Sequence, residues 1–549
     1  MNNFDYIIAA IFVVFVISLG MALSRNGKNM KDFFAGGGNV PWWISGLSLF
    51  MSFFSVGTFV VWGAIAYSDG FVSITIQATM ALSGAFVAFL IGPAWNKTGC
   101  LTVAEYLQKR LNVRAQKIYS FIFILVSLFT TGAFLYPVGK IIEISTGLPL
   151  ETAILILGLL IIAYTAVGGL WAVLVTDVLQ FVVLTAAVLL VIPLSFEYIG
   201  GVTQFFDKLP QGFTELHNER YDLLFLFGFF IYNTVFIGGN WAYVQRYTSV
   251  RSPSSAKKVG LTFFSLYLIA PIIWMLPPMI YRIVNPDVAG TNPEDAYLLM
   301  SKEVLPNGLL GLILGAMVFA TASSVNTTIN IVAGVLTNDI FKSFRPNTSQ
   351  KSLVKIARIS TVLFGLVSIV VALSIKSFGG IVETVLSVAA LTGVPIYLPP
   401  IWSLFSKRQN AFSILFTTFA SLGINLLLKF LAPSLIDFSL SRGEEMIIGV
   451  FIPILFLILF ELILKKENKL VVKEDAEEAK VETQSTYGKK VIFVGVLGIG
   501  LLLIGLGLIG EKATGLTIGT GGFIALIAIS GFLKLISEDK KLKTSLVGK

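Results

Sequence analysis

The stretch FATASSVNTTIN, from Phe319 to Asn330, interrupts an apolar run, with LLGLILGAMV before it and IVAGVL after it. Seven of its twelve side chains carry a hydroxyl or an amide. The complete run is long enough to cross the hydrocarbon core of a bilayer, which is about 30 Å thick, as a single helix. Polar groups at that depth are costly and usually functional. The stretch therefore indicates a membrane helix with a polar site near its middle.

The composition of the whole chain also indicates a protein that lies in the membrane. Of the 549 residues, 55% are hydrophobic and 13% are charged, whereas a soluble protein has about 25% charged residues. We therefore expect an all-α polytopic membrane protein with the lipid bilayer as a partner. The net charge of +9 does not indicate nucleic-acid binding, because the Lys and Arg residues lie in short loops between apolar runs, where they determine topology.

Side chains for metal binding or nucleophilic catalysis are scarce. Cys100 is the only cysteine and His217 the only histidine, and they are too few and too far apart to suggest a zinc site or a Cys/His pair. His217 is expected in an outer loop. We therefore expect a protein that is not an enzyme.

The hydropathy predicts fifteen membrane helices. The segment TVAEYLQKRLN, residues 102–112, is too polar to span and is expected to form a short interfacial helix on the inner side. The predicted spans are approximately residues 4–24, 42–68, 71–96, 116–146, 150–167, 170–198, 223–245, 259–285, 305–337, 353–376, 379–405, 409–432, 444–465, 490–510 and 515–537.

Charge predicts the orientation. The run Phe4–Ser24 carries Asp5 at its start, and its first basic residue, Arg25, follows it. This pattern favours a retained helix with the N terminus outside over a cleaved signal peptide. Most Lys and Arg residues, Arg246 included, then fall in inner segments, as the positive-inside rule requires. We expect a multi-pass protein of the inner (plasma) membrane with a cytoplasmic C terminus.

Two spans contain helix-breaking or strongly polar residues near their middles. Trp42–Gly70 has a Ser-Gly-Thr cluster, and Leu226–Arg246 has Asn233 and the pair Gly238–Gly239. In either span alone these would most simply be packing residues. However, the two spans are five apart in the count, as expected of two five-helix repeats with inverted topology. Such repeats carry broken helices at corresponding positions, with the binding site between them.

The opening stretch predicts a cation site. On a helix, Ala320, Ser323, Ser324 and Thr327 lie along one stripe. Their neutral oxygens suit Na⁺, whereas a tight Ca²⁺ site would use carboxylates. Backbone carbonyls from the broken helix would have to complete the coordination. The alternative is that the hydroxyls bond to carbonyls of their own helix.

Asp177 is an ionisable residue within a span, which suggests a function by default. The alternative is that it pairs structurally with a nearby basic residue.

The chain resembles the sodium/solute symporter family, the sodium/glucose-type carriers, over roughly residues 4–435. The similar stretches are DFFAGGGNVPWWISGLSL, TVAEYLQKRLN, YTAVGGLWAVLVTDVLQ, YVQRY and ASSVNTTINIVAGVLTNDIF. The resemblance implies a leucine-transporter-like fold, in which one helix precedes a core of five plus five helices and about four follow it. The expected segments are 1–40 (first helix and inner loop), 41–406 (transport core), 407–465 (additional helices), 466–489 (charged cytoplasmic linker) and 490–549 (two C-terminal helices and tail).

The resemblance also implies binding residues. The main sodium site would use the carbonyls of Met51, Phe54 and Ala320 with the hydroxyls of Ser323 and Ser324. A second sodium ion would use Asp177 with Ser323, Asn326 and Thr327. The expected solute-contacting residues are Ser55, Thr58, Gln77, Asn233, Phe236 and Tyr267.

Some of these positions depart from the pattern of bacterial sodium/galactose carriers. Tyr267 replaces a lysine, Ala389 a glutamine and Phe236 a tyrosine, so galactose itself is not expected. No Lys or Arg is expected at the pocket, which disfavours a carboxylate, although the N terminus of a broken helix could bind one.

The expected function is Na⁺-coupled symport of a small, neutral, polar solute, sugar-like or otherwise, by alternating access. The alternative is a carboxylate, amino acid or sialic acid as the solute. A channel is disfavoured, because polar residues cluster at the middle of two spans and do not form a continuous lining. A transporter-like sensor is also disfavoured, because no output domain follows Lys540. The expected partners are the solute and sodium ions, with no obligate protein partner evident.

Overall fold

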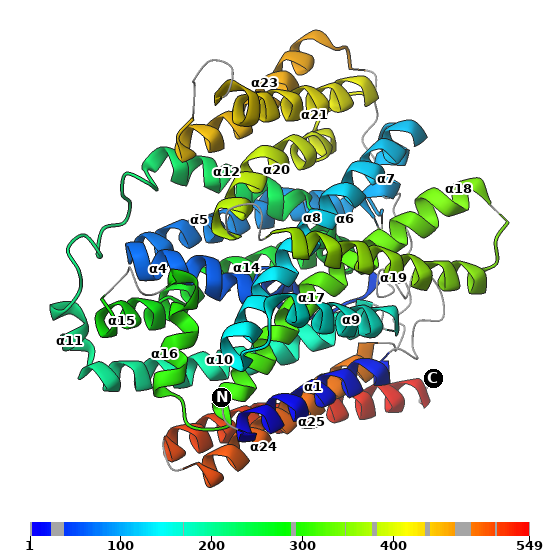
Figure 1. Cartoon of the computed structure of the whole chain (residues 1–549). Coiled ribbons are helices and arrows are strands. Elements are labelled where there is room, and N and C mark those ends of the chain that lie inside the picture. The colour runs from blue at the N-terminus through cyan, green and yellow to red at the C-terminus, as the bar shows by residue number, and fades with distance from the viewer. Residues whose placement is uncertain are drawn as a thin grey trace.

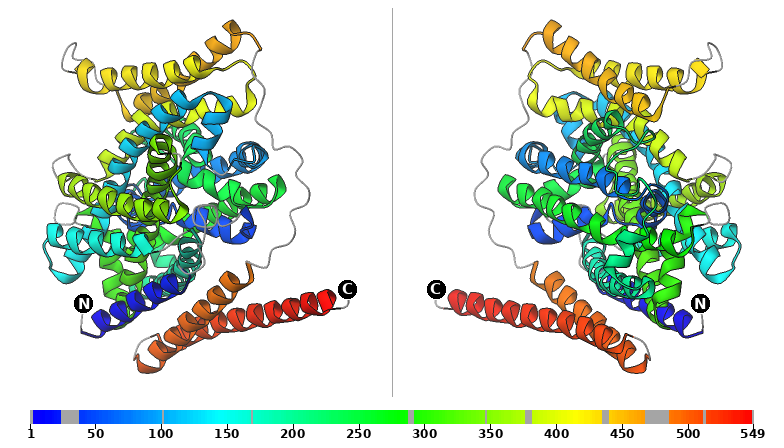
Figure 2. Two further views of the ribbon diagram at one scale, coloured as in Figure 1. Left: turned by 90° about the vertical axis from the view of Figure 1, so that its right-hand side faces the viewer. Right: turned by 90° about the vertical axis from the view of Figure 1, so that its left-hand side faces the viewer.

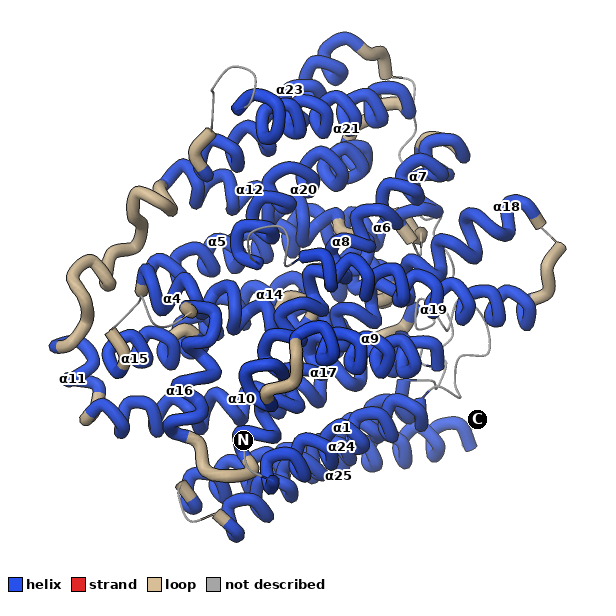
Figure 3. Tube along the Cα trace, viewed as in Figure 1, coloured by secondary structure: helices blue, strands red, loops and turns tan. Residues whose placement is uncertain are grey.

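The computed structural model is built from helices and loops, with no strand in the part of the chain that it describes (Figures 1 and 3). The described residues are 3–23, 38–100, 102–167, 170–286, 292–345, 347–375, 381–433, 440–466, 485–510 and 513–547. The expected all-α class is confirmed.

The first half of the chain contains α1 (Asn3–Leu23), α3 (Trp42–Met51), η3 (Thr58–Trp62), α4 (Gly63–Asp69), α5 (Val72–Phe86), η4 (Val87–Ile91), α6 (Gly92–Lys97), α7 (Val103–Arg110), α8 (Val113–Thr146), α9 (Leu150–Val167), α10 (Leu170–Ile199), α11 (Val202–Asp207), α12 (Leu223–Gly239), α13 (Trp241–Thr248) and α14 (Pro253–Trp274). The second half contains α15 (Leu276–Val284), η5 (Pro293–Asp295), α16 (Ala296–Val304), α17 (Leu309–Gly334), η6 (Val335–Phe341), α18 (Lys342–Phe344), α19 (Gln350–Ser374), α20 (Ile381–Phe405), α21 (Ala411–Leu426), η8 (Leu427–Leu431), α23 (Arg442–Ile463), α24 (Ser485–Ile509) and α25 (Thr514–Val547).

Each predicted span coincides with one helix or with consecutive helices. Among the described residues, ten helices are long and apolar enough to cross a membrane, or eleven if one bent pair counts as a single span. The predicted interfacial segment forms α7. The prediction missed α11 and α16, which are short helices in the connections between spans.

The first predicted break is present. Helix α3 ends at Met51, and helical structure resumes only after Ser55, where the wide turn η3 leads into α4. Residues 52–55 therefore interrupt the helix. The N–H of Ser52 still bonds to the carbonyl of Ser48, but the N–H groups of Phe53 and Phe54 bond only three residues back. Some backbone carbonyls thus lose the partners that a continuous helix would give them.

The second break lies at Asn240, one residue after the glycine pair that predicted it. Helices α12 and α13 meet there at 58°. The backbone of Asn240 is extended, and its side-chain oxygen accepts the N–H of Ala242 at 2.9 Å, so this residue caps α13. Gly238 and Gly239 instead allow close packing, because a Cβ on either would crowd Ile91 or Tyr397.

Helices α1 and α24 lie outside the two repeats but pack on them. Helix α17 contacts α1, α8, α10 and α19, and α10 also contacts α24. The pair α21 and α23 lies at one side of the molecule and the hairpin α24–α25 at the opposite side (Figures 1 and 2). In that hairpin Gly500 and Gly521 face each other's backbones, so at least these glycines serve close packing between neighbouring helices.

Candidate functional site

The first break lies directly against the polar middle of α17. The backbone N–H of Val56 donates to Oγ1 of Thr321 at 2.9 Å, and Oγ of Ser324 donates to the carbonyl of Ser52 at 3.4 Å. These two bonds join α17 to both ends of the broken segment. Thr321 and Ser324 of α17 therefore contact the backbone of the break, beside the positions predicted for the cation site.

The main-site positions are buried around this junction. Met51, Phe54 and Ala320 are each 1% exposed or less, and Ser324 is 5% exposed. The carbonyl of Met51 accepts the N–H of Phe54 at 3.1 Å in the turn that begins the break, which leaves its second lone pair. The side chain of Ser323 lies outside the described residues.

Two of the predicted solute contacts, Ser55 and Thr58, bond to the backbone of the break in this structure. The hydroxyl of Thr58 donates to the carbonyl of Phe53 at 2.9 Å and accepts the N–H of Ser55 at 3.1 Å. The hydroxyl of Ser55 accepts the N–H of Gly57 at 3.1 Å. These bonds satisfy backbone groups that the missing helical turn leaves without partners.

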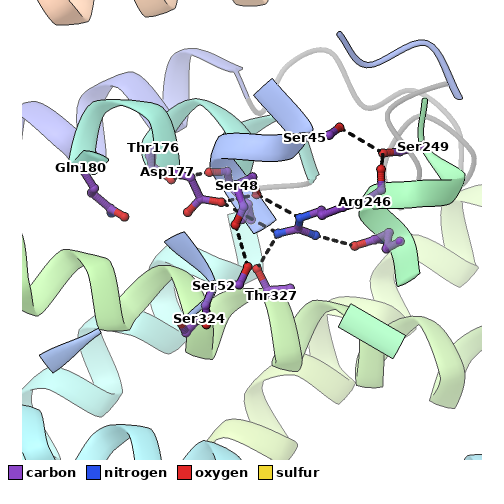
Figure 4. A network of polar contacts seen from close by, with 12 residues as sticks. Ser45, Ser48, Ser52, Thr176, Asp177, Gln180, Arg246, Ser249, Ser324 and Thr327 are labelled. Atoms are coloured by element: carbon purple, nitrogen blue, oxygen red, sulfur yellow. Dashed lines mark hydrogen bonds and ion pairs between the residues drawn. The ribbon is translucent and has the colours of Figure 1, made fainter. Parts of the chain in front are cut away.

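A second polar cluster lies beside α17 and joins four helices (Figure 4). Oδ2 of Asp177 accepts the hydroxyl of Ser48 and lies 3.9 Å from Nη2 of Arg246. Arg246 donates through Nε to Ser48 at 2.9 Å and through Nη2 to Oγ1 of Thr327 at 3.2 Å. Its Nη1 donates to Oε1 of Gln245 at 3.0 Å.

The position of Arg246 corrects the sequence analysis, which placed it among the charges of an inner segment. Its side chain is fully buried, at 0% exposed. The predicted span ended at residue 245, whereas the helix continues to Thr248. Arg246 therefore lies inside the second half of the broken helix. The quoted motif YVQRY carried this residue, but an arginine at the end of an apolar run looks like a topology signal.

Two of the residues predicted for a second sodium ion, Asp177 and Thr327, belong to this cluster. Arg246 bridges Asp177 and Thr327, and Nδ2 of Asn326 is buried without a hydrogen-bond partner among the described residues. The alternative role of Asp177, a structural pair with a basic residue, is thus present in this conformation. A buried pair is stable only with further hydrogen bonds, and Ser48 and Thr327 supply them.

The remaining predicted solute contacts lie on helices that pack on one another. Gln77 is on α5, Asn233 and Phe236 are on α12, and Tyr267 is on α14; both α12 and α14 pack against α5. The ring of Phe53, from the break, lies 6.0 Å from that of Phe236 and 6.2 Å from that of Tyr267. The fold therefore brings two of these residues to the break.

Two polar atoms of this group have no hydrogen-bond partner among the described residues. They are Oε1 of Gln77, which is 0% exposed, and the hydroxyl of Tyr267, which is 2% exposed. Nδ2 of Asn233 donates to the carbonyl of Phe229 at 2.8 Å. Buried polar atoms without partners are rare in native proteins and suggest a missing water or ligand. The side chain of Ala389 lies outside the described residues.

Comparisons with known proteins show what the chain is similar to. The family model described as "Sodium:solute symporter family" matches residues 33–419. A sodium/glucose cotransporter of Vibrio parahaemolyticus is 26% identical over 468 residues, covering 78% of this chain and 86% of the relative. The sodium/sialic acid symporter NanT of Aliivibrio fischeri is 27% identical, covering 77% and 86%. The human sodium/myo-inositol cotransporter 2 is 28% identical, covering 74% and 66%.

Solved structures show the same fold. A Na⁺-coupled sialic acid symporter in a substrate-bound outward-open state has a TM-score of 0.74 at 23% identity, covering 85% of this chain and 99% of that one. The nucleobase-cation-symport-1 family transporter MHP1 has a TM-score of 0.53 at 14% identity. Together with the two broken helices, these likenesses confirm the leucine-transporter-like fold expected from the sequence.

Proposed function

Because the chain belongs to the sodium:solute symporter family, we propose that it moves a small, neutral, polar solute across the membrane together with sodium, by alternating access. Sodium is the coupling ion of this family, and the protein is a multi-pass membrane transporter and not an enzyme. The observation that carries the proposal is the junction of the first break with α17, where Ser324 meets the carbonyl of Ser52.

The proposed main sodium site combines groups from the two sides of this junction. The carbonyls of Met51 and Phe54 would come from the break, and the carbonyl of Ala320 with the hydroxyls of Ser323 and Ser324 from α17. All are neutral oxygens, which suits a weakly held monovalent cation. Because the ligands belong to two separate elements, sodium binding would draw them together and favour one conformation over the other.

The proposed solute site lies beside the break, among Gln77, Asn233, Phe236 and Tyr267. The oxygen of Gln77 is an acceptor and the hydroxyl of Tyr267 is both donor and acceptor, and both lack partners among the described residues. Phe53 and Phe236 supply apolar surface next to Tyr267. Uncharged hydrogen-bonding groups beside aromatic rings suit a hydroxyl- or amide-bearing solute, such as the glucose and inositol that relatives carry.

A carboxylate-bearing solute is the second candidate, because two of the relatives are sodium/sialic acid symporters. The buried Arg246 would not serve it in this conformation, because its three nitrogens donate to Ser48, Gln245 and Thr327. A carboxylate would instead need backbone N–H groups at a broken helix. We therefore favour the neutral solute.

For the second cation position, we propose that the Arg246 guanidinium and a sodium ion are alternative occupants. In the described conformation the positive charge beside Asp177 is that of Arg246. A sodium ion bound by Asp177, Asn326 and Thr327 would require the guanidinium to move away, because two positive charges would otherwise lie side by side at one buried carboxylate. Sodium occupancy would then be coupled to displacement of α13, the inner half of the second broken helix.

The orientation is likewise proposed from charge: the N terminus outside and the C terminus in the cytoplasm, in the plasma membrane. The proposed transport core comprises residues 41–406, with additional helices at 407–465, a linker at 466–489 and a C-terminal pair at 490–549, while residues 1–40 precede the core.

Uptake into proteoliposomes tests the function. A screen for thermal stabilisation in NaCl would first identify the solute among sugars, polyols, amino acids, sialic acids and small carboxylates, because a bound ligand stabilises the folded state. Uptake of the hit should need an inward sodium gradient. Uptake that is unchanged when choline replaces sodium would contradict sodium coupling, and hits limited to carboxylates would contradict the neutral solute.

A further inference from the structure

Asp5 lies where two helices begin. It is in the first turn of α1, yet its side chain is 3% exposed. Its Oδ1 accepts the backbone N–H of Gly308 at 2.6 Å and that of Gly311 at 3.3 Å, both at the start of α17. N–H groups in a first helical turn have no partner within the helix. The carboxylate supplies one for α17, and its charge faces the positive ends of both helices.

From this cap, α1 follows α17 in parallel and at close range. Gly308 has a φ of +90°, and a Cβ on Gly311 would overlap the backbone of Asp5. Further along, Gly315 packs against Ala9 and Phe12. The ring of Phe12 meets that of Phe319 edge to face, with centroids 6.2 Å apart. The contact therefore extends from the start of α17 to Phe319, the residue before Ala320.

We propose that Asp5 is a positioning residue for sodium binding: by fixing the N-terminal end of α17 to α1, it sets the register of Ala320 and Ser324 against the first break. This inference rests on the sodium site proposed above. Twelve residues separate Gly308 from Ala320, about 18 Å along a helix. A helix transmits a shift or rotation of its end along its length, so a loosened cap would displace both ligands from the break.

The test is the sodium concentration that gives half-maximal uptake, measured in the full-length protein in proteoliposomes. Asp5→Ala removes the cap, and that concentration should rise by about three- to tenfold. This range is expected if part of the free energy of the cap contributes to sodium binding. Asp5→Asn keeps one acceptor oxygen and should give a smaller rise. Gly311→Ala pushes α1 away from α17 and should resemble Asp5→Ala.

Gly498→Ala is the matched control, because Gly498 is on α24 and faces Phe15 on α1, away from the cap. It should leave the sodium dependence unchanged. At saturating sodium, the Asp5 and Gly311 variants should approach the parent's maximal rate and solute KM. Sodium-induced thermal stabilisation of the purified variants, measured without solute, should shift by the same factor.

A purely structural role would lower yield and thermal stability without moving the sodium concentration at half-maximal uptake, and that result would overturn the inference. If Asp5→Ala does not fold, Asp5→Asn and Gly311→Ala decide the question. The two proposals fail separately. A parent protein without sodium dependence would refute the proposed function, whereas a sodium-dependent parent with variants of identical dependence would refute only the role of Asp5.

Discussion

Replacing Arg246 with Gln should destabilise the protein more than any exposed charge substitution. The guanidinium is 0% exposed and makes three hydrogen bonds, and Asp177, 1% exposed, lies 3.9 Å away. Removing one partner of a buried ion pair typically costs about 3–5 kcal/mol, because the remaining charge is left uncompensated. Ser48 still donates to Asp177, so we expect about 3 kcal/mol, the lower end of that range.

Arg251→Gln is the control, because Arg251 is nearby in the sequence but exposed, with a contact to Asn39 at 3.3 Å. Its effect should stay within about 0.5 kcal/mol. Unfolding of each purified variant can be followed by tryptophan fluorescence during titration with a denaturing detergent, in sodium-free buffer.

The double variant Asp177→Asn/Arg246→Gln distinguishes pairing from general packing. Removing both charges should recover part of the loss, with a coupling of about 0.5–3 kcal/mol between the two positions. The reasoning would be refuted if Arg246→Gln cost no more than Arg251→Gln. It would also be refuted if the effects of the two single substitutions were simply additive.

Three further predictions concern transport and pH. If a second sodium ion displaces Arg246, Asp177→Asn should lower the charge moved per solute molecule, measured from paired currents and radiolabel uptake. Slower transport with an unchanged charge-to-solute ratio would mean that Asp177 has only a structural role. Tyr267→Phe removes the unpartnered hydroxyl and should raise the solute KM by about tenfold or less, while the sodium dependence is unchanged. An unaltered KM would mean that the solute does not contact this hydroxyl. Burial raises the pKa of Tyr106, which bonds Ser403 at 2.9 Å, to about 12. Its folded state thus holds the proton longer than the unfolded state, so stability is complete below the ordinary pKa of 10.0 and falls as pH rises from there to about 12. Tyr106→Phe should reduce this alkaline loss in a pH series of unfolding measurements, and an identical loss would contradict the assignment.

The sequence predicts most of the architecture because hydropathy, span length and positive charge are local signals. Both broken spans could be found, since clusters of Ser, Thr and Gly that recur five spans apart in apolar runs are typical of inverted repeats. The residue at which the second span bends is not encoded by the glycine pair alone. Glycine pairs permit a bend, but the residue that makes it is Asn240, whose side chain caps the next half-helix.

The Arg246 cluster could not be predicted, because its partners Ser48, Asp177 and Thr327 are far apart in sequence. Nothing local distinguishes an arginine at the end of a helix from one buried inside the bundle. The cap of α17 by Asp5 was missed for the same reason: an acidic residue at the start of a first helix fits an outside N terminus equally well. Contacts between helices, and not propensities, determine both.

The role of the junction between the first break and α17 is tested most directly by the sodium dependence of Ser324→Ala. This substitution removes one proposed ligand hydroxyl, which contacts the Ser52 carbonyl at 3.4 Å, and leaves a residue compatible with the helix. Uptake at a fixed solute concentration should require several-fold more sodium for half-maximal rate, with membrane insertion and thermal stability in sodium-free buffer close to the parent's. Ser324→Ala transport with the parent's sodium dependence would contradict sodium binding at this junction.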